Sequence, residues 1–178
     1  MRLDKKFFTK DPFQSSLELV GANLCCKLQD NSVFRARICE LELYTEKEKG
    51  CHAFGGKCTK RNDAMFLSGG HTYVYLCYGM YNMLNIVLDK EGVAAAVLIR
   101  ALEHKGCEGP GKLARFLGIT RSDNKIDLCN SEKMWIEERD FKPEIVAGKR
   151  IGIDYAGKDA ELPWRFAIKG SPFISKPI

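Results

Sequence analysis

The stretch VFRARICELELY, residues 33 to 44, alternates apolar and polar side chains, which is the pattern of a β-strand. One face carries Cys39, Leu41 and Leu43, and the other carries Ile38, Glu40, Glu42 and Tyr44. Such a strand is typical of an antiparallel sheet, whose second face is by default solvated. Glu42 and Tyr44 therefore share either a solvated face or a face that meets a ligand, and the spacing does not decide between them.

The segments around this strand predict a mixture of helices and strands. Residues 15–28 have leucines at helical spacing after a serine that can cap, and predict a first helix. Residues 45–70 are rich in glycine and charge and predict a long surface connection, which in a compact domain is usually functional. The other expected elements are strands at 71–78, 80–88, 93–102, 150–155 and 164–169, and a helix at 109–119 that begins near Pro110.

Arg100 interrupts an apolar run, VAAAVLIRAL, and a buried guanidinium is costly unless a carboxylate pairs with it. We expect Glu42 or Glu40 as the partner, because Arg offers a carboxylate two parallel hydrogen bonds. A structural ion pair explains this pattern as well as a catalytic one does.

Several aromatic residues accompany these charges. Tyr44, His52, Tyr75 and Tyr73 could form a cage for a flat or cationic ligand, and core tyrosines with bonded hydroxyls are the alternative. Tyr78 precedes Gly79 at the tip of the expected hairpin, where a ring buries nothing in its own chain. An exposed apolar tip marks contact with another molecule, and in a basic protein one such contact is insertion into a nucleic-acid stack.

Composition limits the function classes. The chain has 178 residues, which is enough for one domain, and its net charge of +5 mildly favours a polyanionic partner. The N-terminus lacks the pattern of a signal peptide, no apolar run is long enough for a membrane helix, and the eight cysteines include no C-x-x-C. We therefore expect a cytosolic protein with unpaired thiols and no metal site.

The segment GCEGPGKL, residues 106 to 113, nearly matches a phosphate-binding loop. Leu113 stands where that loop needs a hydroxyl for magnesium, so a nucleotide-triphosphate site is disfavoured. Lys112, near the start of the expected helix, can still meet a phosphate of a nucleic-acid backbone.

Taken together, these motifs resemble the alkyladenine type of DNA-3-methyladenine glycosylase, the methylpurine DNA glycosylase family. The resemblance covers the chain from about residue 15 to 175. The matching blocks, in order, are RICELELY, CHAFGG with TKRNDAMF, YVYLCYGMYNMLNI, VLIRALE, GPGKLARFLGIT and PWRFAIKGSPFIS.

The resemblance implies an α+β fold of a single domain spanning residues 1–178, in which a curved antiparallel β-sheet has flanking helices and a protruding β-hairpin. It implies no metal and no organic cofactor. The expected protein is a monomer in the cytoplasm or bacterial nucleoid, or in the nucleus of a eukaryote, and its partner is double-stranded DNA containing alkylated bases. The implied substrates are 3-methyladenine and 7-methylguanine, with hypoxanthine or ethenoadenine as further candidates.

The resemblance also implies a role for individual residues. Glu42 matches the base that activates water, and Arg100 the residue that helps to hold it. The implied substrate-base pocket consists of Tyr44, His52, Tyr75 and Asn85, with Tyr78 as the intercalating residue. Beside these, Arg61 and Lys112 are candidate contacts to the DNA backbone. Arg100⁺ is expected to keep the pKa of Glu42 low enough for the carboxylate to ionise. A non-catalytic protein that binds damaged DNA is the alternative.

Two departures from the family pattern concern this site. The segment YTEKEKGCH is one residue shorter than the usual spacing, which bears on the placement of His52. Leu41 and Leu43 replace a common threonine and a common small residue beside Glu42.

The register of the hairpin is a further expectation. A two-residue turn at Gly79-Met80 would place Tyr75 opposite Leu84, whereas a three-residue loop through Tyr81 would place it opposite Asn85. A shared pocket needs Tyr75 and Asn85 on one face, so we expect the longer loop.

Overall fold

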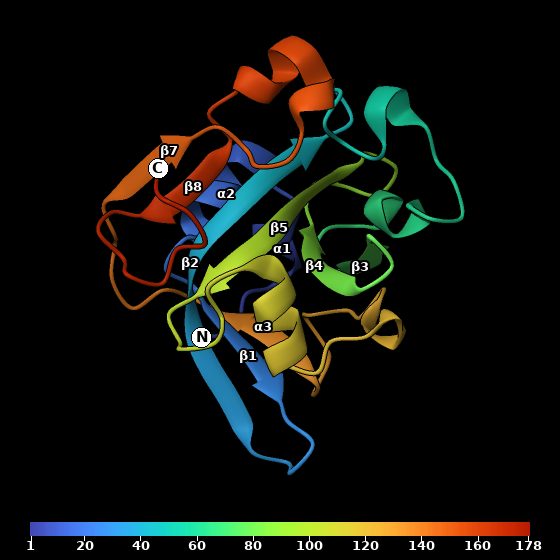
Figure 1. The fold of residues 1–178 in the computed structure, drawn as a ribbon. Coiled ribbons are helices and arrows are strands. Elements are labelled where there is room, and N and C mark those ends of the chain that lie inside the picture. Colours follow the sequence, from blue (N-terminus) through green and yellow to red (C-terminus); the bar gives the residue numbers. More distant parts are fainter.

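A computed structural model describes residues 1–178, and its strands form one curled antiparallel sheet (Figure 1). The strands follow the order β3-β4-β5-β2-β1-β6, and β8 pairs with both β2 and β7. Their bounds are β1 Asn23–Lys27, β2 Val33–Thr45, β3 Thr72–Cys77, β4 Tyr81–Val87, β5 Ala95–Leu102, β6 Met134–Glu137, β7 Ile145–Gly148 and β8 Arg165–Ile168. The predicted curved antiparallel sheet is confirmed.

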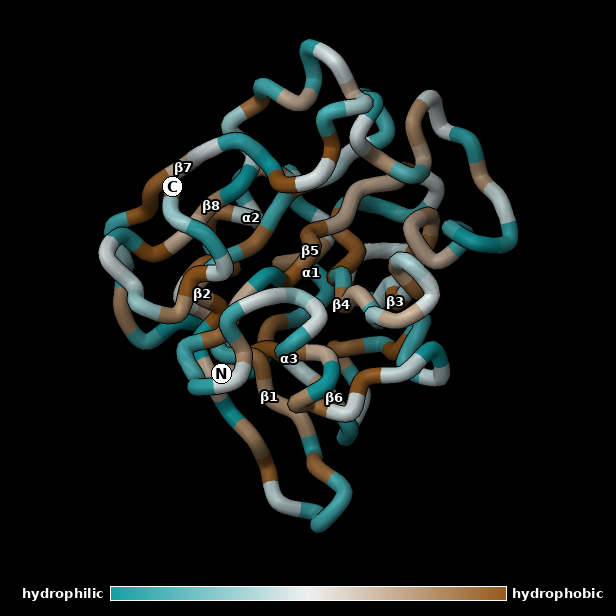
Figure 2. Tube along the Cα trace, in the orientation of Figure 1, coloured by the Kyte–Doolittle hydropathy of each residue, from teal (hydrophilic) through white to brown (hydrophobic).

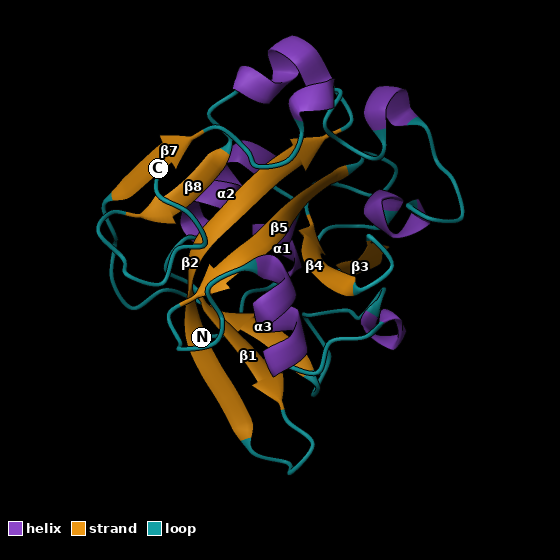
Figure 3. Ribbon diagram, viewed as in Figure 1, coloured by secondary structure: helices purple, strands orange, loops and turns teal.

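Three short α-helices and four 3₁₀ segments accompany the sheet. They are α1 Lys5–Phe8, α2 Pro12–Leu19, α3 Pro110–Phe116, η1 Phe54–Gly56, η2 Asp63–Phe66, η3 Arg121–Asp123 and η4 Asp154–Glu161. Helix α2 packs on β2 and β5, and α3 packs on β4 and β5. The predicted long connection over residues 45–70 carries η1 and η2, which stand out beside the strands in Figure 3. No helix is long and apolar enough to cross a membrane.

Strand β2 organises the sheet, because its first half pairs with β1 and its second half pairs with β5 and β8. The register slips between Ile38 and Glu40, which marks a β-bulge. The extra residue there lets both Ile38 and Cys39 join the main core, so the prediction that Ile38 faces away from Cys39 is wrong. Beyond the bulge the alternation holds, with Leu41 and Leu43 in that core.

The opposite face of β2 is not solvated, because Glu40 and Glu42 are both fully buried. A second, smaller core lies on this side and includes Ala64 and Met65 from the connection over residues 45–70. Tyr44 and Tyr75 pack against it. Figure 2 shows apolar residues concentrated in the strands and hydrophilic residues in the projecting loops. The carboxylates of β2 therefore lie between the sheet and a covering layer of chain.

The first predicted helix, over residues 15–28, is wrong in its second half. Helix α2 begins after Asp11, whose side chain accepts a hydrogen bond from the Gln14 N–H, and it ends at Leu19. The chain then turns at Gly21, where φ is +89°, and enters β1. β1 lies between β2 and β6 and is buried on both faces, and such a strand carries apolar residues that imitate helical spacing.

The strand predicted at residues 150–155 is also wrong. β7 ends at Gly148, and the following segment turns at Gly152, where φ is +76°, before it enters η4. The backbone here makes no ladder, because the Ile151 N–H donates to the Glu42 carboxylate and Gly152 turns the chain at positive φ. The strand predicted at 164–169 is confirmed as β8.

The hairpin of β3 and β4 turns through a three-residue loop, Tyr78 to Met80, since Cys77 pairs with Tyr81. The expected loop length is confirmed, but the predicted register is wrong: Tyr75 lies opposite Met83, and Tyr73 lies opposite Asn85. Tyr75 and Asn85 nevertheless share a face, because residues two apart on a strand point the same way.

Candidate active site

A cavity of about 580 Å³ opens beside the hairpin, on the side of β2 and β5 that carries the buried carboxylates. It brings together residues from β2, the connection over 45–70, β3, β4, β5 and the segment 151–155. Seven of the nine predicted site residues line it, namely Tyr44, His52, Arg61, Tyr75, Tyr78, Asn85 and Arg100. Glu42 lies directly behind the lining, and Lys112 lies outside the cavity.

Glu42 is fully buried and bonded on three sides. Its carboxylate accepts hydrogen bonds from the Ile151 N–H at 2.8 Å and the Tyr44 hydroxyl at 2.7 Å, and Arg100 Nη1 lies 3.3 Å from Oε1. All three partners line the cavity. The Glu42 carboxylate therefore sits immediately beneath the cavity floor, with its orientation fixed.

The pKa of Glu42 is raised above its ordinary value. Burial is the largest cause, and the Arg100 charge, the Tyr44 hydroxyl and the Ile151 N–H lower the pKa by less. Arg100 lowers the pKa of Glu42, as expected, but the desolvation of the carboxylate raises it by more. A carboxylate with a raised pKa has the basicity that suits a general base near neutral pH.

A second buried carboxylate, Glu40, lies two residues back along the same face of β2. It accepts hydrogen bonds from Arg100 Nε at 3.2 Å, from Arg165 Nη1 at 3.0 Å and from the Ser175 hydroxyl at 2.9 Å. The sequence offered Glu42 or Glu40 as the partner of Arg100, and the structure shows both. Arg100 thus bridges the two carboxylates, one of which borders the cavity.

The walls of the cavity are aromatic. The His52 and Tyr75 rings stand edge to face with centroids 4.7 Å apart, and the Tyr73 ring lies 5.3 Å from that of Tyr75. His52 Nδ1 is 2.9 Å from the Tyr73 hydroxyl. The Asn62 side-chain amide donates to the His52 carbonyl at 2.9 Å and thereby holds the loop. The shortened segment before His52 still delivers this ring to the cavity.

The protonation states of these walls follow from their surroundings. Burial against the tyrosines, together with the nearby Arg61 charge, lowers the pKa of His52. Burial raises the pKa of Tyr73 and of Tyr75 above the ordinary tyrosine value. At neutral pH the walls therefore consist of a neutral imidazole and neutral phenols.

Asn85 lines the cavity and is buried. Its side-chain amide donates to the Tyr73 carbonyl at 3.0 Å and to the Met83 carbonyl at 3.2 Å. These two acceptors fix the amide on the cavity side of the hairpin.

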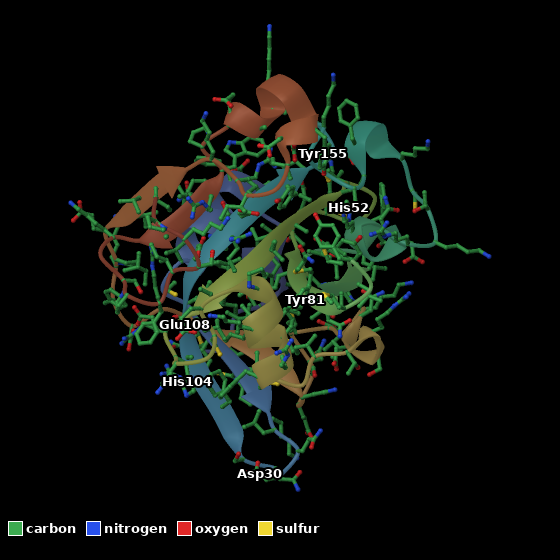
Figure 4. All side chains as sticks on the ribbon, in the orientation of Figure 1. Asp30, His52, Tyr81, His104, Glu108 and Tyr155 are labelled. Atoms are coloured by element: carbon green, nitrogen blue, oxygen red, sulfur yellow. The ribbon has the colours of Figure 1, made fainter.

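The rim of the cavity is exposed. Tyr78 is 90% exposed and has a φ of +50°, a left-handed conformation that is uncommon for residues other than glycine. Arg61 holds its guanidinium 6.0 Å from the centre of the Tyr75 ring, so it borders the cavity itself. Tyr155, 70% exposed, donates its hydroxyl to the Gly50 carbonyl at 3.3 Å. Figure 4 shows Tyr155 and His52 at the same end of the molecule.

Sequence reasoning missed two groups at this site. Tyr155 fell inside the wrongly predicted strand, and only the turn at Gly152 brings it to the rim. Ile151 acts through its backbone N–H, so no side-chain pattern marks it. The one available signal was the single glycine in RIGIDY, which interrupts the alternation.

Lys112 projects from α3 with its side chain 67% exposed, 3.9 Å from Glu108. Leu113 is fully buried in the main core. The first residue of the helix, Pro110, lines the cavity. No group of three His, Cys, Asp or Glu side chains is placed to hold a metal ion, and all eight cysteines are unpaired.

Known proteins resemble this chain over nearly its whole length. The family model of methylpurine-DNA glycosylase (MPG) matches residues 6–172. A protein of Methanocella arvoryzae is 42% identical over 193 residues, which cover 98% of this chain and 96% of the relative. A protein of Alkaliphilus oremlandii is 40% identical over 203 residues, which cover 99% of this chain and 100% of the relative. Both carry the provisional name 3-methyladenine DNA glycosylase.

Proposed function

The chain belongs to the methylpurine-DNA glycosylase family, and on this premise we propose that it excises alkylated purines from duplex DNA with a water molecule activated by Glu42. As a member of this family it is a DNA glycosylase, a hydrolase of N-glycosyl bonds. The observation that carries the proposal is the buried Glu42 carboxylate beneath the floor of an aromatic cavity.

The cavity suits a purine taken out of the DNA stack. Extrusion of a nucleotide costs a few kcal/mol, and less for a damaged base that stacks poorly. A flat ring in the cavity would lie among Tyr44, His52 and Tyr75, and a positively charged 3-methyladenine or 7-methylguanine gains a cation–π attraction that a normal purine lacks. The walls thus favour cationic lesions.

Bond cleavage passes through a state in which the sugar resembles an oxocarbenium ion. A water molecule at the junction of Tyr44, Arg100 and Ile151 would attack the sugar carbon and give its proton to Glu42. The electron pair of the N-glycosidic bond leaves with the base, and a cationic base needs no proton for this. No lysine lines the cavity, so no amine is placed to attack the sugar, and we expect hydrolysis without strand cleavage.

Neutral lesions such as hypoxanthine and ethenoadenine need a proton as they leave. His52 is the titratable wall residue nearest to neutral pH, but its lowered pKa makes it a poor acid there. We therefore propose that cationic purines are released faster than neutral ones.

The rim would engage the duplex around the extruded base. Tyr78 stands at the hairpin tip, where its ring could fill the space that the base leaves. Arg61 at the cavity mouth and Lys112 on α3 would contact phosphates.

A panel of duplexes, each with a single lesion, tests the proposal. The purified protein is incubated with each duplex, and the released bases are identified by chromatography against a reaction without protein. We expect release of 3-methyladenine and 7-methylguanine, slower release of hypoxanthine and intact DNA strands. Tight binding of the lesions without release would instead indicate a non-catalytic binding protein.

A further inference from the structure

A separate buried ion pair, between Glu48 and Arg150, lies next to the groups that bind Glu42. Arg150 Nη1 is 2.7 Å from Glu48 Oε1, and Nη2 is 2.9 Å from Oε2, so both oxygens are bound. The Arg150 side chain is 0% exposed and the Glu48 side chain is 3% exposed. Neither residue contacts the reacting groups of the proposed mechanism.

Arg150 joins three separate parts of the chain. Besides Glu48 in the connection after β2, it donates to the Leu43 carbonyl in β2 at 2.9 Å and to the Asp159 carbonyl in η4 at 3.0 Å. The carboxylate of Asp159 accepts from the Lys49 N–H at 2.8 Å. In Figure 1, η4 and the connection after β2 meet at one end of the molecule. The ion pair fastens these two segments together.

The immediate neighbours of this pair are the groups that bind Glu42. Ile151, next in the chain after Arg150, donates its N–H to Glu42. The Arg150 guanidinium lies 4.7 Å from the centre of the Tyr44 ring, whose hydroxyl also donates to Glu42. Both non-ionic hydrogen bonds of Glu42 therefore depend on where Arg150 is held.

The pair also reaches the loop that carries His52. The Gly50 N–H donates to Glu48 Oε2 at 2.6 Å, two residues before His52. An added Cβ at Gly50 would lie 2.8 Å from that oxygen, so the backbone here runs directly against the carboxylate. One ion pair thus sets both the support of Glu42 and the path of the shortened loop.

We propose that Arg150, held by Glu48, is a positioning residue that fixes the Ile151 N–H and the Tyr44 hydroxyl on Glu42. This inference rests on the proposed function and adds to it a buried residue that does not line the cavity. Buried ion pairs contribute little net stability, because desolvation offsets their attraction. Arg150 also keeps its buried Nε–H without an acceptor. A role in placing the Ile151 N–H and the Tyr44 hydroxyl explains why the pair is present despite these costs better than a contribution to stability does.

The pH dependence of excision would report this placement. A hydrogen bond to a carboxylate favours its ionised form, so weakening the bond from Ile151 or Tyr44 makes Glu42 retain its proton to higher pH. The other charged and titratable groups that bear on Glu42 are Glu40, Arg100, Tyr75 and, across from it on β8, Arg165. All of these remain unchanged in the variants below.

Two substitutions keep the local charge and remove the geometry. Glu48→Asp shortens the carboxylate by one methylene, and Arg150→Lys removes the planar fork that binds both oxygens. A third variant, Glu48→Gln, removes a negative charge, whose direct effect would move the titration of Glu42 to lower pH. Leu24→Ala, in the core at β1, serves as the control for a general loss of stability.

The measurement is the single-turnover rate of 7-methylguanine release across pH, corrected for spontaneous release, alongside affinity for the lesion duplex and the melting temperature. The acid arm is the part of the pH–rate profile in which the rate falls as Glu42 takes up a proton. We expect all three variants to move this arm to higher pH by about one unit, because a weakened hydrogen bond to a carboxylate changes its pKa by about that much. At a fixed pH within that arm, the rate should then fall about tenfold, with affinity within a few-fold of wild type. Leu24→Ala should lower the melting temperature without moving the arm.

An acid arm that stays in place in Glu48→Asp and Arg150→Lys, or that moves downward in Glu48→Gln, would overturn the positioning role. If one variant fails to fold, the others give the same test. A wild-type protein that releases no base contradicts the proposed function itself. The two failures are therefore distinguishable.

Discussion

The floor of the cavity is built from buried charges, and the rim is built from exposed rings. On the floor, Glu42 and Glu40 are fully buried, and Arg100 bridges them. On the rim, Tyr78 and Tyr155 are mostly exposed, and Tyr78 also adopts a left-handed backbone conformation. The same cavity therefore joins a fixed, desolvated region to one that is largely uncovered by its own chain.

This difference separates chemistry from recognition. Groups that are bonded in place before the substrate arrives need no reorganisation during the reaction, which is what an activated water requires. Exposed rings gain little until another molecule covers them. Changes on the floor should therefore alter the rate of excision and the stability of the fold, whereas changes on the rim should alter the binding of DNA.

The substitution Glu42→Gln tests the floor most strongly. The amide keeps the shape of the carboxylate but cannot take a proton, and loss of a general base typically costs about 10² to 10⁴ in rate. We expect single-turnover excision to fall about 10³-fold, with lesion-duplex affinity within a few-fold of wild type. Glu91→Gln, on an exposed turn, is the matched control. Full activity in Glu42→Gln would refute the assignment of the base.

The same variant should not be less stable than the wild type at neutral pH. Because burial raises the pKa of Glu42, the protonated form favours folding, and this contribution is lost as the pH rises through the raised pKa. The difference in free energy of unfolding between Glu42→Gln and the wild type should therefore become smaller as the pH is lowered. Chemical denaturation at several pH values measures it.

Arg100→Ala should damage both properties of the floor. Its removal leaves Glu42 and Glu40 buried with fewer counter-charges, and breaking a buried pair in this way costs about 3–5 kcal/mol. We expect that loss in the free energy of unfolding, and excision reduced about 10²-fold in the protein that remains folded. Arg37→Ala, which removes two partly exposed ion pairs, should cost at most about 1 kcal/mol for each pair. Equal costs for both variants would show that the floor is not energetically distinct.

The contrast between floor and rim also separates what the sequence could predict from what it could not. The alternation in β2 placed Glu42 and Tyr44 together, and a lone arginine in an apolar strand indicated an ion pair. The alternation of a single strand does not reveal whether its polar face meets water or a covering layer. Glu40 is covered by Arg165 and Ser175, which lie more than a hundred residues further along the chain.

The hairpin register failed for a local reason. In the sequence CYGMY, several adjacent residues can form the turn, and each choice moves every cross-strand pair by one. The structure uses Tyr78 and Gly79 at positive φ, and nothing in the pattern predicts that a tyrosine will accept this conformation. The shared face of Tyr75 and Asn85 survived because the actual register differs from the predicted one by two residues on β4.

On the rim, Tyr78→Ser should weaken binding without changing the fold. The serine cannot fill the space left by an extruded base, and base stacking on an aromatic ring is worth about 1–3 kcal/mol. We expect lesion-duplex affinity to fall about tenfold, with the free energy of unfolding changed by less than about 1 kcal/mol. Tyr78→Phe keeps the ring and should bind like the wild type. If Tyr78→Ser lost stability but kept its affinity for the lesion duplex, Tyr78 would have a structural role and not a role in DNA binding.

The smallest effect is expected just outside the rim, at Lys112. Its ammonium is mostly exposed and only loosely paired with Glu108, so it is free to neutralise a phosphate. Each phosphate contact contributes about 0.9 to the slope of log affinity against log salt concentration, because bound counterions are released. Lys112→Gln should therefore reduce that slope by about 0.9 and lower affinity a few-fold at physiological salt, equally for damaged and undamaged duplexes.

Lys27→Gln provides the control for this last prediction. Lys27 is exposed at the end of β1, three residues before Asp30 in the turn between β1 and β2. Figure 4 shows Asp30 at the opposite end of the molecule from His52 and Tyr155. Removing its charge changes the net charge by the same amount but leaves the cavity side intact. An equal change of slope in both variants would mean that DNA responds only to the overall charge. A change confined to Lys112 would extend the DNA-binding rim from the hairpin to α3, while the rate of excision at saturation, set by the floor, stays the same.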